Sequence, residues 1–553
     1  MIRTLLSLKM PPMKKSGNPF CWMIILLLSF FSLFSSAQVN YTIPGEPDFI
    51  GSCTSIMVGR LATTDGSVIT SHSCDGPYRT WVDIFPHTKY EKGAVHTVYT
   101  GTLNPRKTSY DMRNVRKTGE IPEVQETYAF LNTAYPCLNE KQLAIGETTI
   151  GARRQLRNTE GIFYIEELEK IALQRCTTAR EAIKLIGRLA EEYGYGDNGE
   201  CITIADPKEV WQFEISGSGK GKPSALWCAA RIPDDHVGVS ANVPRISTID
   251  FDDPERFMYS TNLRQVAKDL GYWDDKEPMK FWKVISSNKK AYSTREFYIL
   301  STMAPLLNLN EDAEELPFSV KPDKKLSVRD VMKYYRETYE GTKFDNTRNL
   351  TVTQQSTDSN GNTVNEKSIS PVASPWIGND LWMLIYELKP EVVDLKYTIA
   401  QNWCSYSEVI QCRSWLPDEV GAVAWFSFDN PALSPRIPVF SGVMKLPDSF
   451  EICGQYNYTH DAAIWSFRET NRLAVIRWGE GRKLIEPAVM EFEDRAFEDL
   501  PVIEKKIIEL VRSGKNDEAK KYLTDYTNNF AYAAMKRWEE MKVPIWNSFS
   551  IGF

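Results

Sequence analysis

One cysteine near the start of the chain stands where an enzyme could use it as a nucleophile. Cys53 begins a short β-prone run over residues 53–59, and the segment before it, residues 38–52, has two prolines, two glycines and little periodicity. Removal of that segment would place the thiol and a free α-amino group on the same residue. An α-amino group has a pKa of roughly 7.7–8.0, so it can act as general base for the thiol. The sequence therefore predicts a candidate N-terminal nucleophile.

Two other interpretations of Cys53 stay open on the residues alone. The first is a buried structural cysteine at the start of a strand. The second is lipidation, because residues 50–53 read IGSC and look like the small-residue motif that is cut before an acylated cysteine. That motif should follow an apolar run directly, whereas here the run ends at Phe34 and 18 residues lie between it and Cys53. The spacing argues against a lipid anchor.

The N-terminal residues have the composition of a targeting signal. Residues 21–34 read CWMIILLLSFFSLF, with Lys14 and Lys15 upstream and the small residues 35–37 (SSA) downstream. The stretch is shorter than the ~20 residues of a membrane span, which makes a retained anchor the alternative. We expect a signal peptide over 1–37, a removable propeptide over 38–52, and export to a periplasm or the extracellular space. Met1 and Met13 both remain candidate starts.

The residues after Cys53 predict the elements that must position it. The runs 53–59 and 68–71 are β-prone and are joined by a turn with Asp-Gly at its centre, which predicts a hairpin that begins at the cysteine. Residues 210–215 alternate with a period of two and predict a strand. The glycine-rich residues 216–223 lack the hydroxyl residue of a phosphate-binding loop and indicate a turn.

Helices are predicted in the middle and at the end of the chain. Residues 178–181 (TARE) form a capping box before an amphipathic segment that ends at Gly194 and Gly196. From about residue 480 the pattern is helical, with a stop at the Ser-Gly of residues 513–514. The polar residues 355–369, with Asn-Gly, indicate an exposed loop or insertion.

Five segments in order resemble one enzyme family. They are CTSIMVG–TDGS–SHSCD (53–75), LNEKQLAIGETT (138–149), GECITIADPKEVW (199–211), ARIPDD–VSAN (230–242) and QCRSWLP–VGAVAWF (411–426). They resemble the dipeptidases of peptidase family C69, which are N-terminal-nucleophile (Ntn) hydrolases related to penicillin V acylase and bile-salt hydrolase. The resemblance covers residues 53 to roughly 445.

This resemblance implies an α+β fold, a four-layer αββα Ntn-hydrolase sandwich with a helical C-terminal elaboration. The catalytic domain would span 53–445 and a mainly helical subdomain 446–553. The implied function is an exported cysteine dipeptidase whose nucleophile, Cys53, is exposed by propeptide removal, autocatalytically or by another protease. The substrate would be a dipeptide or short peptide, and the chemistry needs no cofactor. An amidase or acylase acting on a non-peptide amide is the alternative, and a Cys53-lipidated binding protein is the non-enzymatic one.

The resemblance also implies roles for individual residues. Asp75 would orient the α-amine of Cys53, and Asn242 would help to form the oxyanion hole. Asn242 could instead make an Asx turn before Pro244. His72 stands where many relatives carry arginine; it is a third catalytic candidate, and a polar residue on a strand face is the alternative.

Three more residues are substrate-binding candidates. Thr149 matches a position that lines the pocket of related acylases. Glu147 and Arg413 could bind the charged ends of a peptide, because a dipeptidase must recognise a free ammonium or carboxylate. Both could equally be structural.

Composition excludes several other classes. The chain has 553 residues with 72 acidic and 65 basic side chains, which gives no electrostatic reason to expect a nucleic-acid partner. Five histidines without an HExxH motif, and no CxxC, argue against a metal site and a zinc peptidase, and no GxSxG elbow occurs. No later stretch reaches transmembrane length, so no integral membrane domain is expected. Ten cysteines are too few for a disulfide scaffold; their pairing and the oligomeric state, including a homo-oligomer, stay open.

Overall fold

The computed structural model describes residues 52–76, 78–103, 115–221, 223–357, 359, 361–455 and 457–550. The predicted signal peptide and the predicted propeptide up to residue 51 lie outside this part of the chain. Within the described ranges, no helix combines the length and the apolar character that a membrane crossing requires.

Seven strands form the sheet that carries Cys53. In spatial order they are β16 (Ser319–Val320), β14 (Val237–Ser240), β1 (Ser55–Val58), β2 (Val68–Asp75), β19 (Cys404–Cys412), β20 (Ala422–Phe428) and β21 (Ile437–Phe440). Neighbouring strands are antiparallel. Strands β1, β2, β19 and β20 are buried along their whole length, so both faces of the sheet are covered. The hairpin predicted after Cys53 is confirmed as β1 and β2.

Eight strands form a second sheet that packs against the first. Their order is β15 (Phe257–Tyr259), β13 (Ala225–Ile232), β12 (Val210–Gly217), β11 (Glu200–Ala205), β10 (Ala144–Thr149), β9 (Leu138–Asn139), β8 (Phe130–Asn132) and β3 (Asp83–Phe85). Strand β2 lies on β10 and β11. The approach is close at Gly146, where an added Cβ would lie 2.4 Å from the carbonyl oxygen of Ser71. Glycine at this position therefore lets the two sheets meet directly behind the cysteine.

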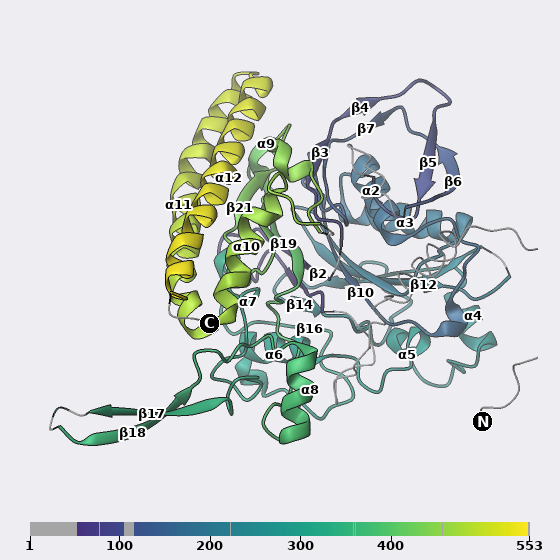
Figure 1. Cartoon of the computed structure of the whole chain (residues 1–553). Helices are drawn as coiled ribbons and strands as arrows, with labels where there is room; N and C mark the ends of the chain where they lie inside the picture. The colour runs from purple at the N-terminus through teal and green to yellow at the C-terminus, as the bar shows by residue number, and fades with distance from the viewer. Residues whose placement is uncertain are drawn as a thin grey trace, which may run out of the picture. The chain divides into compact units, whose positions relative to one another are not determined.

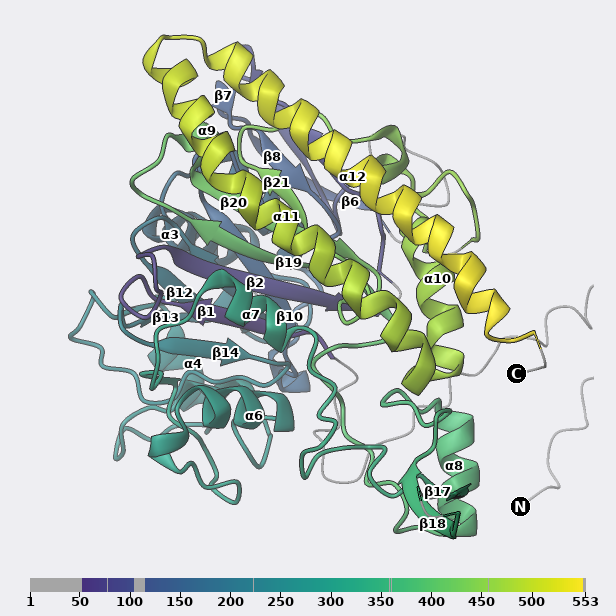
Figure 2. The ribbon, with the colours of Figure 1, turned by 90° about the vertical axis from the view of Figure 1, so that its left-hand side faces the viewer.

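Helices cover both sheets (Figure 1). Helices α2 (Ile165–Arg175) and α3 (Ala179–Tyr193) lie on the second sheet, and α3 has the predicted capping box and ends at Gly194. On the first sheet, α10 (Ala463–Ile476) packs on β20, and α11 (Trp478–Arg512) and α12 (Asn516–Asn547) pack on β21, as Figure 2 shows.

The C-terminal helical region is confirmed, and its first helix precedes residue 480, where the helical pattern was expected to begin. That helix, α10, starts at Ala463. It was not predicted because its buried face includes Arg468, Thr470 and Asn471, and these polar residues hide the apolar periodicity. The helices, strands and sheets together confirm a mixed α/β fold with a helical C-terminal region.

The segment 355–369 differs from its prediction. It is exposed, as expected, but it belongs to a β-hairpin of β17 (Thr351–Thr357) and β18 (Thr363–Ile369). The loop alternative was wrong because Thr and Val residues extend the pairing on both sides of the turn at Gly361, whose φ is +83°. The other alternative, an insertion, stays a prediction.

The remaining elements lie around the two sheets. They are β4 (Thr88–Lys89), β5 (Val95–Tyr99), β6 (Lys117–Pro122), β7 (Glu126–Thr127), α4 (Leu263–Asp269), α5 (Phe281–Ile285), α6 (Thr294–Met303), α7 (Val328–Tyr334), α8 (Asn379–Leu388), α9 (Asp418–Gly421) and the 3-10 turns Arg154–Leu156, Pro305–Leu307 and Asp448–Glu451. Of these, α6 contributes directly to the site.

Candidate active site

Cys53 lies two residues before β1, and its side chain is 1% exposed. Its Sγ accepts a hydrogen bond from the backbone N–H of Asp75, at 3.4 Å. Burial raises the pKa of the Cys53 thiol well above its usual value, and the carboxylates of Glu147 and Asp75 act in the same direction. The thiol is therefore protonated at neutral pH, and its use as a nucleophile requires a base nearby.

Asp75 ends β2, and its backbone N–H is the donor to Cys53 Sγ. Its Oδ2 accepts a hydrogen bond from Ser73 Oγ at 2.9 Å, while its Oδ1 is buried and receives no N–H or O–H donor. Burial raises the pKa of the Asp75 carboxyl to about 6, against the opposing effect of its hydrogen bonds. A buried acceptor without a donor is the kind of group that a neighbouring cation would satisfy.

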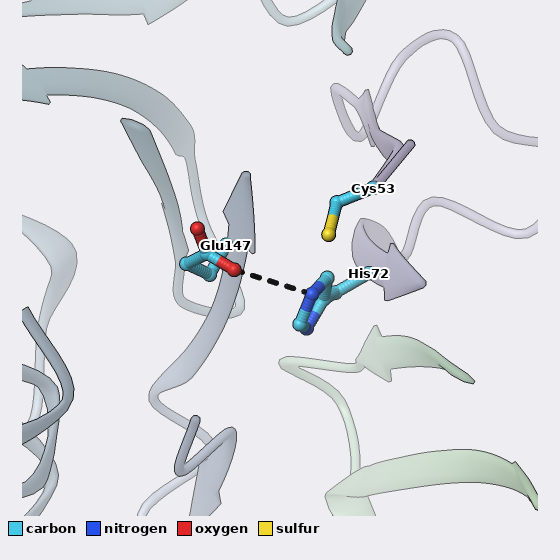
Figure 3. A group of neighbouring side chains, drawn as sticks. All are labelled: Cys53, His72 and Glu147. Carbon is cyan, nitrogen blue, oxygen red and sulfur yellow. Dashed lines mark ion pairs between the residues drawn. The ribbon is translucent and has the colours of Figure 1, made fainter. Parts of the chain in front are cut away.

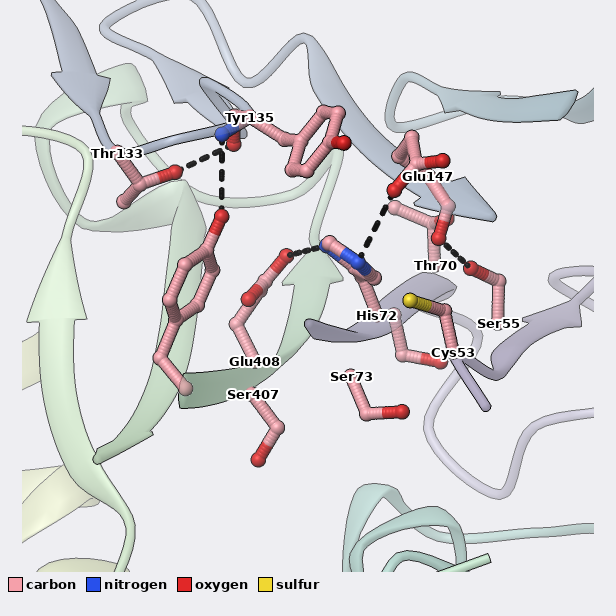
Figure 4. A network of polar contacts seen from close by, with 12 residues as sticks. Cys53, Ser55, Thr70, His72, Ser73, Thr133, Tyr135, Glu147, Ser407 and Glu408 are labelled. Atoms are coloured by element: carbon pink, nitrogen blue, oxygen red, sulfur yellow. Dashed lines mark hydrogen bonds and ion pairs between the residues drawn. The ribbon is translucent and has the colours of Figure 1, made fainter. Parts of the chain in front are cut away.

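His72 lies between two glutamates on the face of β2 that meets the second sheet (Figure 4). Its Nε2 is 3.4 Å from Glu147 Oε2, and its Nδ1 is 3.3 Å from Glu408 Oε1. Burial disfavours a charge on the ring, but Glu408 and Glu147 outweigh that effect and raise the pKa of His72. The two carboxylates thus favour the protonated form of the ring.

Cys53, His72 and Glu147 are close neighbours (Figure 3). The Cys53 Sγ, a ring nitrogen of His72 and a carboxylate oxygen of Glu147 all lie within 4.8 Å of one another. Thiolate, imidazole and carboxylate are zinc ligands, so these are the residues that could hold a metal ion. Both ring nitrogens of His72 already face carboxylates, however, and the resulting imidazolium competes with metal coordination.

Asn242 follows β14 with a φ of +66° and lines a cavity together with Cys53. Its Nδ2 donates to the carbonyl oxygen of Thr149 at 2.7 Å, and its Oδ1 accepts from Arg295 Nη2 at 2.9 Å. Among the described residues, no hydrogen bond of this side chain closes a local turn before Pro244. The amide keeps a second N–H, which could bind an oxyanion.

Arg295 is a site residue that sequence reasoning missed. It lies at the start of α6, is 2% exposed, and donates to the carbonyl oxygen of Cys53 at 2.5 Å and to Asn242. The capping box of Ser293 and Glu296 begins α6, and Glu296 also binds the backbone N–H of Ala241. That capping box is visible in the sequence, but nothing in it shows that the helix reaches a cysteine 242 residues away.

Glu408 is the second missed residue. It lies opposite His72 in the antiparallel pair of β2 and β19 and is fully buried. An acidic residue within an otherwise uncharged buried strand was the available signal, because such a charge is rare unless it has a partner.

A cavity of about 270 Å³ opens at the thiol. Cys53, Asn242 and Thr149 line it, and Thr149 Oγ1 also donates to Glu147 Oε1 at 3.2 Å. Its wall carries three further carboxyl groups, those of Glu166, Asp197 and Glu200. The structure thus brings together six of the seven predicted site residues.

The structure does not bring Arg413 to this cavity. The register pairs Cys404 with Asp75 and Cys412 with Val68, so Arg413 follows the end of β19 that is remote from Cys53. Its guanidinium binds Glu504 and the carbonyl oxygens of Gly421 and Val420. These contacts assign Arg413 a structural role between β19 and α11.

Comparisons with known proteins agree with the geometry. The model of peptidase family C69 matches residues 52–490. The chain is 26% identical to a probable dipeptidase of Latilactobacillus sakei over 75% of this chain and 80% of that protein. It is 23% identical to dipeptidase A of Lactobacillus helveticus (73% and 78%) and 26% identical to probable dipeptidase B of Lactococcus lactis (74% and 79%).

Proposed function

This chain belongs to peptidase family C69, and from that premise we propose that it is a cysteine dipeptidase with Cys53 as its N-terminal nucleophile. The names of its relatives support the substrate class, dipeptides and short peptides. The fold would be an Ntn-hydrolase sandwich, in which α10–α12, the two sheets and α2–α3 form the four layers. Export directed by residues 1–37 belongs to the same proposal.

One observation carries the proposal: Cys53 and Ser52 line different cavities. Cys53 lines the 270 Å³ cavity with Asn242. Ser52 lines a second cavity, of about 430 Å³, together with Asp75, and Tyr78 borders both. Cleavage between Ser52 and Cys53 would leave the thiol on one side and the new α-amine on the side of Asp75.

Cleavage of that bond can use the same thiol. The Ser52 carbonyl carbon would move from the nitrogen of Cys53 to its Sγ, and water would then hydrolyse the thioester. The products are a carboxylate on Ser52, a free thiol and the α-amine of Cys53.

Peptide hydrolysis would follow the same route. Cys53 Sγ attacks the carbonyl of the first residue while the α-amine accepts the thiol proton. Asn242 Nδ2 stabilises the oxyanion, and the protonated amine then donates to the leaving nitrogen, so that the second amino acid departs. Water attacks the thioester, the α-amine takes a proton from it, and that proton returns to Sγ as the first amino acid leaves.

Three neighbours would act through these groups. Asp75 Oδ1 is the acceptor that holds the α-amine, which gives the unpartnered oxygen a donor. Arg295 fixes the Asn242 side chain and the carbonyl of Cys53. His72 places a positive charge near the sulfur, where it favours the thiolate.

The test joins mass spectrometry with a substrate panel. The mature protein should begin at Cys53 by intact mass or N-terminal sequencing, and it should hydrolyse dipeptides in preference to bile-salt or penicillin amides. A mature chain that begins at Gln38, an acylated cysteine, or activity confined to the non-peptide amides would contradict the proposal.

A further inference from the structure

The wall of the nucleophile cavity carries an excess of carboxyl groups. Glu166 comes from the start of α2, Asp197 precedes β11, and Glu200 begins β11. Arg79 pairs with Glu166 at 3.0 Å. Among the described residues, neither Asp197 nor Glu200 forms an ion pair.

Glu200 is the carboxyl group with an unused acceptor. It is 3% exposed, it lines the cavity, and its Oε2 has no hydrogen-bond partner. Glu200 lies directly opposite Thr149 in the antiparallel pair of β10 and β11, so the two side chains share the face that also carries Glu147. This places an unsatisfied buried oxygen on the face that points toward Cys53.

The carboxyl groups repel one another when ionised. Glu147 and Glu200 lie close enough to influence each other's pKa. Burial raises the pKa of Glu166 to about 8, and burial with the Glu147 and Asp197 carboxylates raises that of Glu200 well above its usual value. Filling the cavity with a cation would relieve this repulsion, whereas an anion or an apolar group would not.

Size and position limit which cation can bind. The cavity holds about 270 Å³, which is below the range of about 300–1,000 Å³ typical of sites for drug-sized ligands. A carboxylate oxygen of Glu147, on the face that Glu147 shares with Glu200, lies within 4.8 Å of Cys53 Sγ. In a peptide the α-nitrogen of the first residue lies only about 2.5 Å from the carbonyl carbon that the thiol attacks. The α-ammonium of a bound dipeptide would therefore lie beside these carboxyl groups.

We propose that this acidic wall binds the free α-ammonium of the substrate's first residue, with Glu200 Oε2 as its main acceptor. The inference rests on the proposed function of Cys53 and narrows its substrate class to peptides with an unblocked N-terminus. The first amino acid becomes the thioester, and the enzyme releases it as a single residue. An N-acylated peptide places a neutral amide against the carboxyl groups and binds poorly.

The acidic wall does not bind the α-ammonium of Cys53 itself. Ser52, whose removal creates that group, lines the other cavity. Asp75 lines that second cavity as well, and its Oδ1 is buried without a hydrogen-bond partner among the described residues. The acidic wall is thus left for a ligand that enters from outside.

The experiment compares substrates that differ in one group. Processed wild-type enzyme is assayed on Ala-Leu, on N-propionyl-leucine, which lacks only the ammonium, and on N-acetyl-Ala-Leu. We expect kcat/KM for Ala-Leu to exceed that for each of the other two by about 100-fold, the scale of a charge-assisted hydrogen bond in a buried site. Equal kcat/KM for Ala-Leu and propionyl-leucine would overturn the inference without using any variant.

A variant then locates the effect. Glu200→Gln should raise KM for Ala-Leu and reduce the preference over propionyl-leucine to within about tenfold, while hydrolysis of propionyl-leucine is retained. Glu169→Gln is the matched control, because Glu169 is a fully buried carboxyl group of α2 that does not line the cavity. It should leave the preference unchanged. If Glu200→Gln keeps the full preference for Ala-Leu over propionyl-leucine, the proposed role of Glu200 is overturned.

The outcomes also separate this inference from the proposed function. If a Cys53 thioester is trapped at equal rates with both substrates, the proposed ammonium site is refuted and the proposed nucleophile is retained. Hydrolysis of Ala-Leu by Cys53→Ala would instead refute the proposal that Cys53 is the nucleophile, whatever the substrate preference.

Discussion

The two ends of the β2–β19 pair bury charged groups in opposite ways. At one end, beside Cys404 and Asp75, Asp75 Oδ1 lacks a hydrogen-bond partner among the described residues. His72, near the middle of the pair, lies 3.3 and 3.4 Å from its two glutamates. At the other end, Arg413 donates to Glu504 and to two backbone carbonyl oxygens.

The difference distinguishes a structural charge from a functional one. A buried charge costs free energy unless hydrogen bonds satisfy it, and Arg413 meets that condition within the protein alone. The groups around Cys53 meet it only in part, which is the arrangement expected where a substrate or a newly formed α-amine completes the site.

The largest expected effect separates two buried cysteines of the same sheet. Cys53→Ala should lower kcat/KM for dipeptides by at least about 10⁴-fold, because the nucleophile is lost. Cys412→Ala, at the Arg413 end of β19, should keep activity within about twofold. Steady-state kinetics on folded, purified proteins measure both. A similar loss in the two variants would break the comparison between the two ends.

Removal of Arg413 should affect stability and leave catalysis intact. Arg413→Ala should lower the free energy of unfolding by about 3–5 kcal/mol, because Glu504 and two carbonyl groups lose their donor. Arg188→Ala is the control, since Arg188 forms an exposed pair with Glu192 at 3.7 Å and should change stability by at most about 0.5 kcal/mol. Urea unfolding gives both values. A changed kcat/KM per folded molecule of Arg413→Ala would contradict the structural role.

The oxyanion donor is the next effect in size. Asn242→Ala should reduce kcat by about 10²–10³-fold with little change in KM, because the amide acts on the charge that develops during attack. Arg295→Lys should lower kcat by the same route, since lysine cannot hold both Asn242 and the carbonyl of Cys53. Asn262→Ala removes a partly buried amide that binds Ser224 and should leave kcat within twofold. An effect on KM alone would reassign Asn242 to substrate binding.

The smallest effect is the pH dependence that Asp75 imposes on the unprocessed chain. Its folded pKa of about 6 exceeds the ordinary value of 3.8, so the folded state holds this proton more tightly than the unfolded state does. The contribution of Asp75 to stability is therefore greatest below pH 4 and is lost as pH rises through 6, by about 3 kcal/mol in all.

Double variants isolate that contribution. In an uncleaved Cys53→Ala background, Asp75→Asn should gain stability over its parent as pH rises from 4 to 7, measured by urea unfolding. In the processed enzyme the α-ammonium should lower the pKa of Asp75 and reduce the gain. A pH-independent difference between the two uncleaved proteins would show that Asp75 is not the titrating group.

Local sequence patterns predicted the elements around Cys53. The Asp-Gly turn and two β-prone runs after Cys53 became β1 and β2, and the capping box at Thr178 became the start of α3. These patterns succeed because turn and capping preferences act between residues a few positions apart. The hairpin β17–β18 escaped prediction because its strands are exposed and lack an apolar face.

Contacts between distant segments could not be predicted in this way. Arg295 and Asn242 meet because α6 begins beside the end of β14, and Glu408 meets His72 through the register of β19 on β2. Arg413 belongs to a segment that resembles the family, yet the direction of β19 places it at the end of the β2–β19 pair that is remote from Cys53.

The sequence by itself determined that this protein has a cysteine suited to become an N-terminus, ahead of a hairpin and within a C69-like order of segments. Those features are local or follow chain order. The tertiary structure decided which charges surround the thiol: a histidine between two glutamates, an arginine that holds an asparagine, and an acidic wall with one unused oxygen. Burial and close packing of two sheets set those electrostatic interactions, and they arise only when segments far apart in the chain are brought together.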